Sequence, residues 1–360
     1  MLSLPCARID LGALRHNFQQ LKIRTPHSRT MSVVKANAYG HGAIEVAKVL
    51  SQSDAFAVAR TTEAILLRQA GINQPIVLLE GVTTQEELQL ASDFSLSPVF
   101  HHASQLSLLN STILSKPLEF CWLKVDSGMH RLGFSIQESI SAWQQLENSS
   151  SIAGSVGLMT HLANADQPVD NYNQYQWQQF EEVSQSLDVQ RSMANSAAIL
   201  SAPDFHVDWV RPGLMLYGVS PFAESTAAEF GLKPVMQLQA ELIAIHHLQM
   251  GDKVGYGGEW TCPEPMKVGV VAIGYADGYS RHLSSTGSVI VHGQLVPILG
   301  RVSMDMIAVD LRHIEEASPG DNVILWGDEL LTVESVARQA GTIPYELLCA
   351  VSDRVHRDYG

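Results

Sequence analysis

One lysine stands where a buried strand is expected to end. In the stretch SVVKANAYGHG, Lys35 follows the apolar pair Val33 and Val34 and precedes a turn rich in glycine. An apolar setting destabilises an ammonium group, so the pKa of the lysine falls and its neutral amine can condense with a carbonyl. Lys35 is therefore a candidate nucleophile that could carry a Schiff base. The ordinary alternative is a strand-end lysine that extends its ammonium into water.

Short apolar runs recur through the first two thirds of the chain, and helical patterns separate several of them. Asp10 is a possible N-cap of the first helix, and Thr83 with Glu86 matches a capping box before another. Strands joined through helices need parallel crossovers, and eight such units close into a (β/α)8 barrel, which we predict for residues 9–233. An open, doubly wound sheet is the alternative. The eight runs begin at positions 31, 55, 75, 96, 119, 155, 191 and 208.

The pattern changes after about residue 233. The runs VMQLQAELIAIHHL, MKVGVVAIGY, GSVIVHGQLVPILG, MDMIAVDL and DNVILWG are typical of strands and are divided by Gly, Pro and Asp turns. Helical periodicity returns only at TVESVARQAG. We therefore predict a second, mostly β domain over residues 234–360.

A barrel of this type carries its reactive groups at the carboxyl ends of its strands. The segments after three strand ends, NAYGHG, NSAAI and RPGLMLYG, also expose N–H groups that suit an anion such as phosphate, and they place Ser196 and Gly213 there. With Lys35, these segments predict a barrel that holds a phosphorylated aldehyde. The polar residues at the predicted strand ends are Lys35, Lys124, Asp126, His161, Asn195, Ser196 and Arg211.

Composition excludes several classes of function. The net charge is −14 and no basic cluster stands out, so binding to nucleic acid or to an anionic membrane is not expected. The four cysteines form no CxxC or CxxH pair, which argues against a metal site. The N-terminal residues do not form a signal peptide, and no run reaches the length of a membrane span, so we expect a cytoplasmic protein.

Longer motifs carry a specific resemblance. The segments VVKANAYGHG, LKVDSGMHRLGF, MTHLANAD, DWVRPGLMLYG, VGYGGEW, GYADGY, GRVSMDM and TIPYEL occur in order over nearly the whole chain. They resemble the alanine racemases, pyridoxal-phosphate enzymes that supply D-alanine for bacterial peptidoglycan. The resemblance implies a (β/α)8 barrel and a C-terminal β domain, usually joined by the first residues, here 1–8. It also implies a homodimer whose active sites lie between one subunit's barrel and the other's β domain.

The resemblance assigns two catalytic residues. Lys35 would form the aldimine with pyridoxal 5'-phosphate and serve one face of the substrate carbon, and Tyr256 of the partner subunit would serve the other. Tyrosine has a pKa near ~10, so Tyr256 needs positive neighbours, and His161 and Arg211 are the candidates. Arg211 would face the pyridine nitrogen. Because a guanidinium cannot readily give up a proton, that nitrogen should stay neutral. The cofactor-binding positions by resemblance are Lys35, Tyr39, His161, Asn195, Ser196, Arg211, Gly213, Leu214 and Tyr345.

The remaining matches concern the substrate. Lys124 falls where many family members carry a carbamylated lysine that holds the arginine matched by Arg131, and its plain alternative is a surface pair with Asp126. Crowding by Tyr275 and Tyr345 would favour the methyl side chain of alanine over serine. The substrate positions by resemblance are Arg131, Met304 and Asp305, and those of the access corridor are Tyr275, Arg281 and Arg301.

Three rival interpretations remain at this point. A decarboxylase of basic amino acids shares the two-domain plan, but it should lack VGYGGEW and have an acid facing the pyridine nitrogen. A non-catalytic pyridoxal-phosphate carrier would consist of the barrel alone. An aldolase-like barrel would use a Schiff-base lysine without a cofactor.

Overall fold

The structure is a computed structural model that describes residues 5–360. Its first part is a closed barrel of eight parallel strands, in which β9 pairs with β2 to complete the ring. The predicted fold class is therefore confirmed, and each of the eight apolar runs overlaps a barrel strand. The strands are β2 (Arg29–Val33), β3 (Ala55–Val58), β4 (Ile76–Leu78), β5 (Leu96–Phe100), β6 (Leu118–Lys124), β7 (Ile152–Met159), β8 (Arg191–Asn195) and β9 (Trp209–Arg211).

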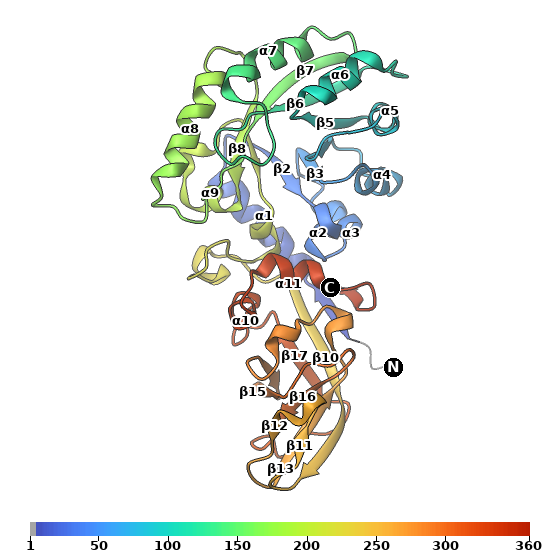
Figure 1. The fold of residues 1–360 in the computed structure, drawn as a ribbon, viewed down its shortest axis with the longest axis vertical. Coiled ribbons are helices and arrows are strands. Elements are labelled where there is room, and N and C mark those ends of the chain that lie inside the picture. The colour runs from blue at the N-terminus through green and yellow to red at the C-terminus, as the bar shows by residue number, and fades with distance from the viewer. Residues whose placement is uncertain (1–4) are drawn as a thin grey trace.

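Helices surround the barrel (Figure 1). Asp10 caps the first of them as predicted, accepting a hydrogen bond from the Ala13 N–H at 2.8 Å. The capping box expected at Thr83 and Glu86 was wrong by one residue, because Thr84 is the N-cap and its hydroxyl accepts the Glu87 N–H. The outer helices are α1 (Leu11–Arg24), α3 (Ala43–Val49), α4 (Thr61–Gln69), α5 (Gln85–Asp93), α6 (Ala103–Ser111), α7 (Ile136–Glu147), α8 (Asn171–Ser184) and α9 (Ser196–Ser201).

The second part is a mostly antiparallel sheet of eight strands in the order β13-β16-β15-β14-β17-β10-β1-β18. The N-terminal strand β1 (Cys6–Ile9) lies in this sheet, between β10 and β18, rather than in the barrel. The other strands are β10 (Met236–Leu248), β13 (Met266–Val271), β14 (Ser288–Val291), β15 (Gln294–Leu299), β16 (Ile307–Asp310), β17 (Asn322–Trp326) and β18 (His356–Tyr359).

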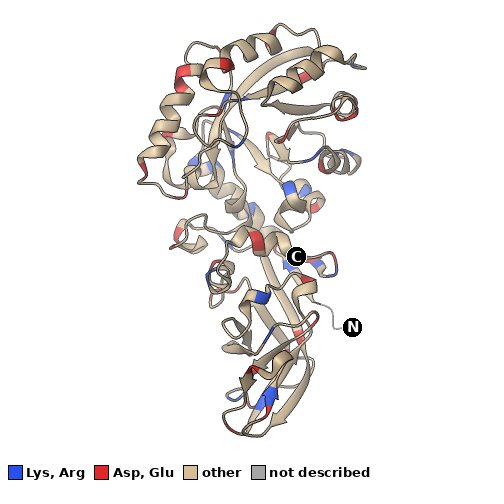
Figure 2. Cartoon of the chain, in the orientation of Figure 1, with Lys and Arg blue, Asp and Glu red and all other residues tan. Residues whose placement is uncertain are grey.

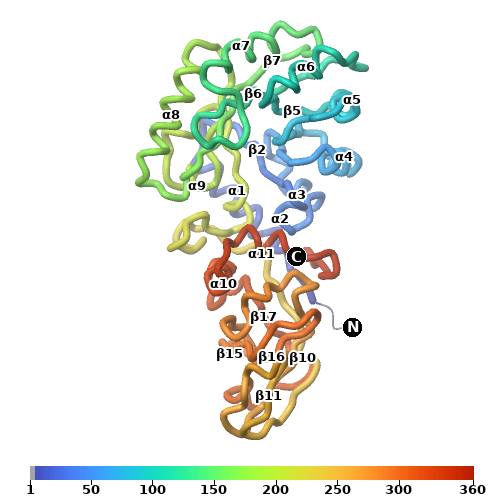
Figure 3. Tube along the Cα trace, viewed as in Figure 1, coloured from blue at the N-terminus to red at the C-terminus, as the bar shows by residue number. Residues whose placement is uncertain are grey.

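Smaller elements complete the second part. A two-stranded ribbon, β11 (Lys253–Val254) with β12 (Trp260–Thr261), lies near the end of the sheet that is remote from the barrel (Figure 1). The helices α10 (Val333–Ala340) and α11 (Pro344–Ala350) lie near the junction with the barrel, to which the red C-terminal segment returns (Figure 3).

One continuous apolar core extends from the barrel into the sheet. It includes the fully buried Trp122 of β6 and Trp326 of β17, so the two parts pack as one body. Inside the barrel, a Cβ on Gly157 would come within 2.7 Å of the Trp122 ring, so only glycine leaves room for that indole. A well-packed interior of this kind tolerates little displacement and fixes the strand ends that carry the polar groups.

Charges lie on both parts of the chain, with Lys and Arg interspersed among Asp and Glu (Figure 2). Within residues 5–360, no group of three or more His, Cys, Asp or Glu side chains is arranged to hold a metal ion. In the same range, no helix is both long and apolar enough to cross a membrane.

Candidate active site

The polar residues predicted at strand ends do meet at the carboxyl end of the barrel. Parallel pairing places Lys124, at the end of β6, beside Met159, two residues before His161. Asn195, at the end of β8, pairs in the same way with Arg211 of β9. Because all eight strands run in the same direction, these ends face one opening, and Lys35 follows β2 into it.

The segment directly after Lys35 has an unusual backbone. Ala36, Asn37, Ala38 and Tyr39 have φ values of 51°, 53°, 54° and 52°, so four successive residues with side chains form a left-handed turn, α2 (Lys35–Tyr39). Each such residue costs about 1–2 kcal/mol relative to a right-handed conformation. The turn must therefore be held by contacts with its surroundings.

A carboxylate from the barrel wall provides one of these contacts. Glu63 Oε1 accepts the Ala36 N–H at 2.6 Å, while Oε2 accepts the N–H groups of Ala59 and Arg60, each at 2.9 Å. The carboxylate thereby ties the peptide that follows Lys35 to the end of β3. Sequence reasoning did not identify Glu63, and its only local signal was its position in the first turn of α4.

A buried histidine provides another contact. His41 Nδ1 lies 2.9 Å from the Tyr39 carbonyl and 3.0 Å from that of Ala38, and its ring stacks on Tyr217 at 4.5 Å. Burial lowers the pKa of His41 to about 4, so the ring is neutral at physiological pH and donates from Nδ1. His41 was also not singled out from the sequence, although it lies in the quoted motif.

Four cationic side chains surround the opening. Burial, together with the positive charges of Arg211, Arg131 and Lys35, lowers the pKa of Lys124 to about 7. Within residues 5–360, none of the four forms a salt bridge with a carboxylate. An excess of positive charge in a partly buried site fits an anionic ligand.

The suggested surface pair between Lys124 and Asp126 was wrong. Lys124 is buried, and Asp126 instead accepts hydrogen bonds from the N–H groups of Gly128 and His130 and contacts the His130 ring, each at 3.0 Å. The Asp126 carboxylate thus organises the loop that leads to Arg131, whose side chain is exposed. The amine of Lys124 is therefore not paired with Asp126 and remains available to a ligand in the opening of the barrel.

Arg211 is held rigidly by groups from the neighbouring strands. Its guanidinium donates to the Ser192 hydroxyl at 2.6 Å and to the carbonyls of Thr160 and Met193. Burial lowers the pKa of Arg211 to about 10, which leaves it charged at neutral pH. His161 Nδ1 lies 3.4 Å from Nη2, and burial together with this charge holds the pKa of His161 well below its ordinary value. The pair is therefore a cation beside a neutral imidazole.

A second group of predicted residues lies beside the left-handed turn. The Ser196 hydroxyl accepts the Gly213 N–H at 2.9 Å, which links the ends of β8 and β9. A Cβ on Gly213 would meet the Tyr39 hydroxyl at 2.7 Å, and the Tyr345 ring lies 5.8 Å from that of Tyr39. The Leu214 N–H begins the short helix η2 (Leu214–Tyr217) and has no acceptor among residues 5–360.

Together these groups form a cradle of hydrogen-bond donors whose chemistry suits an anion such as phosphate. The Tyr39 and Ser196 hydroxyls both contact Gly213, the Leu214 N–H follows directly, and the Tyr345 ring packs beside that of Tyr39. Asn195 contributes differently, because its Oδ1 accepts the Ala198 N–H at 3.1 Å and caps α9. The cation cluster lies at the same end of the barrel, so phosphate and a second negative group could be held together.

The other predicted residues lie in the second part of the chain. Tyr256 begins η4 (Tyr256–Gly258), between β11 and β12, and is 70% exposed. Because this ribbon lies at the remote end of the sheet, the chain does not bring Tyr256 to its own Lys35 (Figure 1). The remaining members of this set lie in the connections β13–β14 and β15–β16, which backbone hydrogen bonds join at Tyr275 and Met304; they are Tyr275, Arg281, Arg301, Met304 and Asp305.

Two of these positions have defined contacts. The Met304 N–H has no acceptor among residues 5–360, so it is available to a ligand. The Asp305 carboxylate instead accepts a hydrogen bond from Arg354 at 2.7 Å, and Arg354 also contacts the buried Asp277 at 3.4 Å. The Asp305 carboxylate is thus already bound by Arg354 of the same chain.

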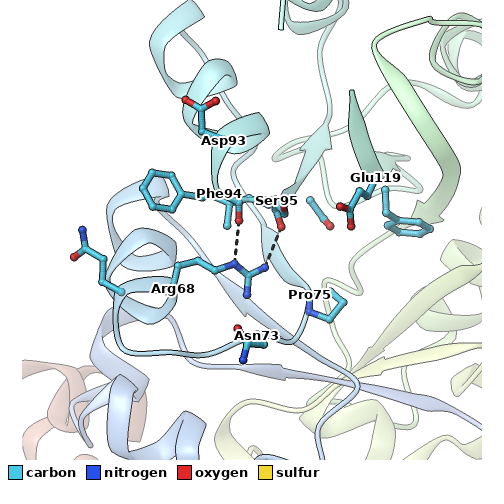
Figure 4. A pocket seen from close by; sticks show the side chains of 11 residues that line it. Arg68, Asn73, Pro75, Asp93, Phe94, Ser95 and Glu119 are labelled. Carbon is cyan, nitrogen blue, oxygen red and sulfur yellow. Dashed lines mark hydrogen bonds between the residues drawn. The ribbon is translucent and has the colours of Figure 1, made fainter. Parts of the chain in front are cut away.

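A cavity of about 560 Å³ lies at the opposite end of the barrel, beside the starts of β5 and β6 (Figure 4). The Arg68 guanidinium at its edge donates to the backbone carbonyls of Phe94, Ser95, Ile72 and Gln74. With its donors engaged in this way, Arg68 has a structural role, and the cavity lacks the reactive cluster found at the carboxyl end.

Comparison with known proteins agrees with this geometry. The family models "Alanine racemase, N-terminal domain" and "Alanine racemase, C-terminal domain" match residues 9–221 and 235–359. The chain is 54% identical over 356 residues to an alanine racemase of Nitrosococcus oceani, covering 99% of each chain. It is 46% identical over 354 residues to one of Coxiella burnetii, covering 97% of each.

Solved structures give the same result. The biosynthetic alanine racemase from Pseudomonas aeruginosa matches with a TM-score of 0.95 and 43% identity, over 100% of both chains. The alanine racemase from Acinetobacter baumannii matches with a TM-score of 0.92 and 40% identity, again over 100% of both chains. These likenesses extend over barrel and sheet together. The chain therefore belongs to the alanine racemase family and is an isomerase.

Proposed function

We propose that the protein interconverts L-alanine and D-alanine with the help of pyridoxal 5'-phosphate. The observation that carries the proposal is the carboxyl end of the barrel, where Lys35 adjoins both the cation cluster and the phosphate cradle. When bound, pyridoxal phosphate supplies a carbonyl that condenses with amines and a conjugated ring that eases loss of the substrate's α-proton.

The residues of the cradle fit this cofactor. Tyr39, Ser196, Tyr345 and the backbone of Gly213 and Leu214 would hold its phosphate, because hydroxyl and N–H donors suit phosphate oxygens. Burial raises the pKa of the Tyr345 hydroxyl to about 12 and that of Tyr39 further, so both remain protonated donors. Asn195 would act indirectly, by capping the helix that carries Ser196.

Arg211 favours racemisation over the rival reactions. Its side chain would face the cofactor's ring nitrogen, and at a pKa of about 10 it keeps its protons at neutral pH. His161, held neutral beside it, cannot supply a proton readily either. The nitrogen would therefore stay unprotonated and withdraw electrons less strongly, which disfavours transfer of the proton to other carbons. A decarboxylase of basic amino acids would present an acid at this position.

Racemisation needs a proton carrier on each face of the substrate's α-carbon. In this proposal Lys35 would carry the proton on one face and Tyr256 on the other. Because Tyr256 lies far from Lys35 along the molecule, we infer a homodimer in which each subunit lends its Tyr256 to the other's barrel. Arg211 and His161 of the receiving subunit would then lie near its hydroxyl.

The substrate carboxylate would meet Arg131 and the free N–H of Met304. Asp305, bound to Arg354, would shape this region rather than contact the substrate. Tyr275, Arg281 and Arg301 would line the corridor that leads to the site, and the size of Tyr275 and Tyr345 favours alanine, with serine as a weaker substrate.

Lys124 is proposed to carry a carbamate. Its lowered pKa of about 7 leaves a neutral amine available to CO2 near neutral pH. The product would be an anion among cations, and it would hold Arg131 in place. The charge excess around the opening would fall by two units.

The division into a barrel over 9–233 and a β domain over 234–360, with residues 1–8 joined to the latter, is part of the proposal. It is supported by β1, which pairs with β10 and β18. The second domain also disfavours a carrier built from a barrel alone. Supply of D-alanine for peptidoglycan and a cytoplasmic location rest on the family resemblance.

The test is to follow a panel of L-amino acids with purified protein and added pyridoxal phosphate, recording optical rotation and CO2 release together. We expect fast racemisation of alanine, slower racemisation of serine and no CO2. Release of CO2 from lysine or ornithine would replace the proposal with a decarboxylase. Cofactor binding without turnover would indicate a carrier, and absence of the visible absorbance of bound cofactor would favour an aldolase-like enzyme.

A further inference from the structure

The loop that carries Tyr256 has little to fix it in its own backbone. Gly255, Gly257 and Gly258 adopt φ values of 74°, 76° and 55°, so Tyr256 is flanked by residues of high conformational freedom. Within residues 255–259, the only backbone hydrogen bond joins the Gly258 N–H to the Gly255 carbonyl at 3.2 Å. The position of an exposed tyrosine in such a loop must be set from outside.

Arg301 contacts this loop on both sides of Tyr256 and forms an ion pair with Glu259 at the end of the loop. Arg301, which follows β15, donates from Nε to Glu259 Oε2 at 2.8 Å and from Nη2 to Oε1. Its guanidinium carbon would lie 3.7 Å from a Cβ on Gly257, and its backbone N at the same distance from a Cβ on Gly255. The guanidinium therefore packs over the loop, and its Nε and Nη2 both donate to the Glu259 carboxylate at the end of the loop.

We propose that the Arg301–Glu259 pair is a clasp that positions Tyr256 for proton transfer. The inference rests on the proposed role of Tyr256 and assigns both members of the pair as positioning residues. A two-armed arginine–carboxylate contact restricts direction as well as distance, which a single ammonium contact does not. Three glycines in the loop make such a restraint effective, because they add no side chain that could compete with it.

The size of the effect follows from the exposure of the pair. In the single chain the side chains are 37% and 55% exposed, so water and salt weaken the attraction and the clasp is a moderate restraint. Loss of the pair should lower kcat by about five-fold, the limit set by an exposed ion pair of this kind. KM should change little, because substrate would still bind while the Tyr256 hydroxyl would be placed correctly less often.

The experiment compares the wild-type holoenzyme with Glu259→Gln, with Arg301→Lys, and with the charge-swapped double variant Glu259→Arg/Arg301→Glu. Glu264→Gln is the matched control, because Glu264 forms a similarly exposed ion pair with Arg312, at 2.6 Å, elsewhere on the same sheet. Turnover is measured with L- and D-alanine at low and high salt, and with α-deuterated substrate.

We expect both single variants to lose kcat with KM retained and the control to match the wild type. The swapped variant should recover most of the loss, and the wild type and the swapped variant, which both keep the ion pair, should lose more kcat on addition of salt than Glu259→Gln. The deuterium isotope effect should rise in one direction more than in the other, because Tyr256 takes the proton from only one enantiomer. A change in folding alone would not produce this asymmetry.

Two results would overturn the inference: equal kcat for Glu259→Gln and Glu264→Gln, or a swapped variant no better than either single variant. Tyr256→Phe, measured alongside, separates this failure from failure of the proposed function. If Tyr256→Phe is inactive while Glu259→Gln is fully active, only the clasp is wrong. If Tyr256→Phe retains turnover, the assigned base is wrong and the clasp has no role in proton transfer.

Discussion

Replacement of Glu63 by glutamine should loosen the left-handed turn that follows Lys35. Four residues in this conformation cost about 4–8 kcal/mol together, at 1–2 kcal/mol each. The glutamine keeps one oxygen, which can serve Ala59 and Arg60, but it turns an amide N–H₂ group toward the Ala36 N–H. Loss of a hydrogen bond to a charged group costs about 1.5–3 kcal/mol.

That loss should appear as weaker cofactor binding, because the turn must then be ordered at the expense of binding energy. Since 1.4 kcal/mol is a factor of ten, we expect the dissociation constant for pyridoxal phosphate to rise by about ten- to a hundred-fold. Absorbance titration of the apoprotein measures this change. Hydrogen–deuterium exchange of residues 36–42 should also become faster in the apoprotein, a result that does not depend on cofactor.

Glu45→Gln is the matched control, because Glu45 lies on the adjacent helix α3 and within residues 5–360 its carboxylate pairs only with Lys48, at 2.9 Å. Its affinity and exchange should equal those of the wild type. If Glu63→Gln also leaves both unchanged, the Glu63 carboxylate does not hold the turn, and our account of how Lys35 is positioned is wrong.

Three further predictions concern the proposed chemistry. Tyr256→Phe should abolish turnover in both directions and keep the visible absorbance of bound cofactor, Lys35→Ala should lose that absorbance, and mixed dimers should regain one complete site; no recovery on mixing contradicts a shared site. Arg211→Glu should raise conversion of alanine to pyruvate by transamination, and an unchanged product ratio counts against a neutral ring nitrogen. Lys124 should show the added mass of one CO2, reversibly. In CO2-free buffer its pKa falls from 10.5 unfolded to about 7 folded, so the unfolded chain binds the extra proton between these values and the free energy of unfolding should rise with pH there. Lys124→Met should remove that contribution, and an identical pH dependence would show that Lys124 is not buried as described.

The sequence by itself determined the barrel and the kind of chemistry it could support. Strand and helix periodicities are local, so eight apolar runs with helices between them could be counted without coordinates. A barrel then requires the polar residues at the strand ends, including Lys35, Lys124 and Arg211, to face one opening. The motifs around them added the family, and with it the expected partner subunit.

Tertiary structure alone decided how these groups are held. The left-handed turn, the Glu63 carboxylate beneath it and the burial of Lys124 away from Asp126 all depend on contacts between residues distant in sequence or on backbone angles that no local pattern encodes. The same holds for the separation of Tyr256 from Lys35 within one chain, since it follows from how the sheet extends from the barrel. Local patterns indicate which face of a helix or strand is apolar. The burial of a charged group, the strain of a turn and the distance between two residues depend on which distant parts of the chain the fold brings together.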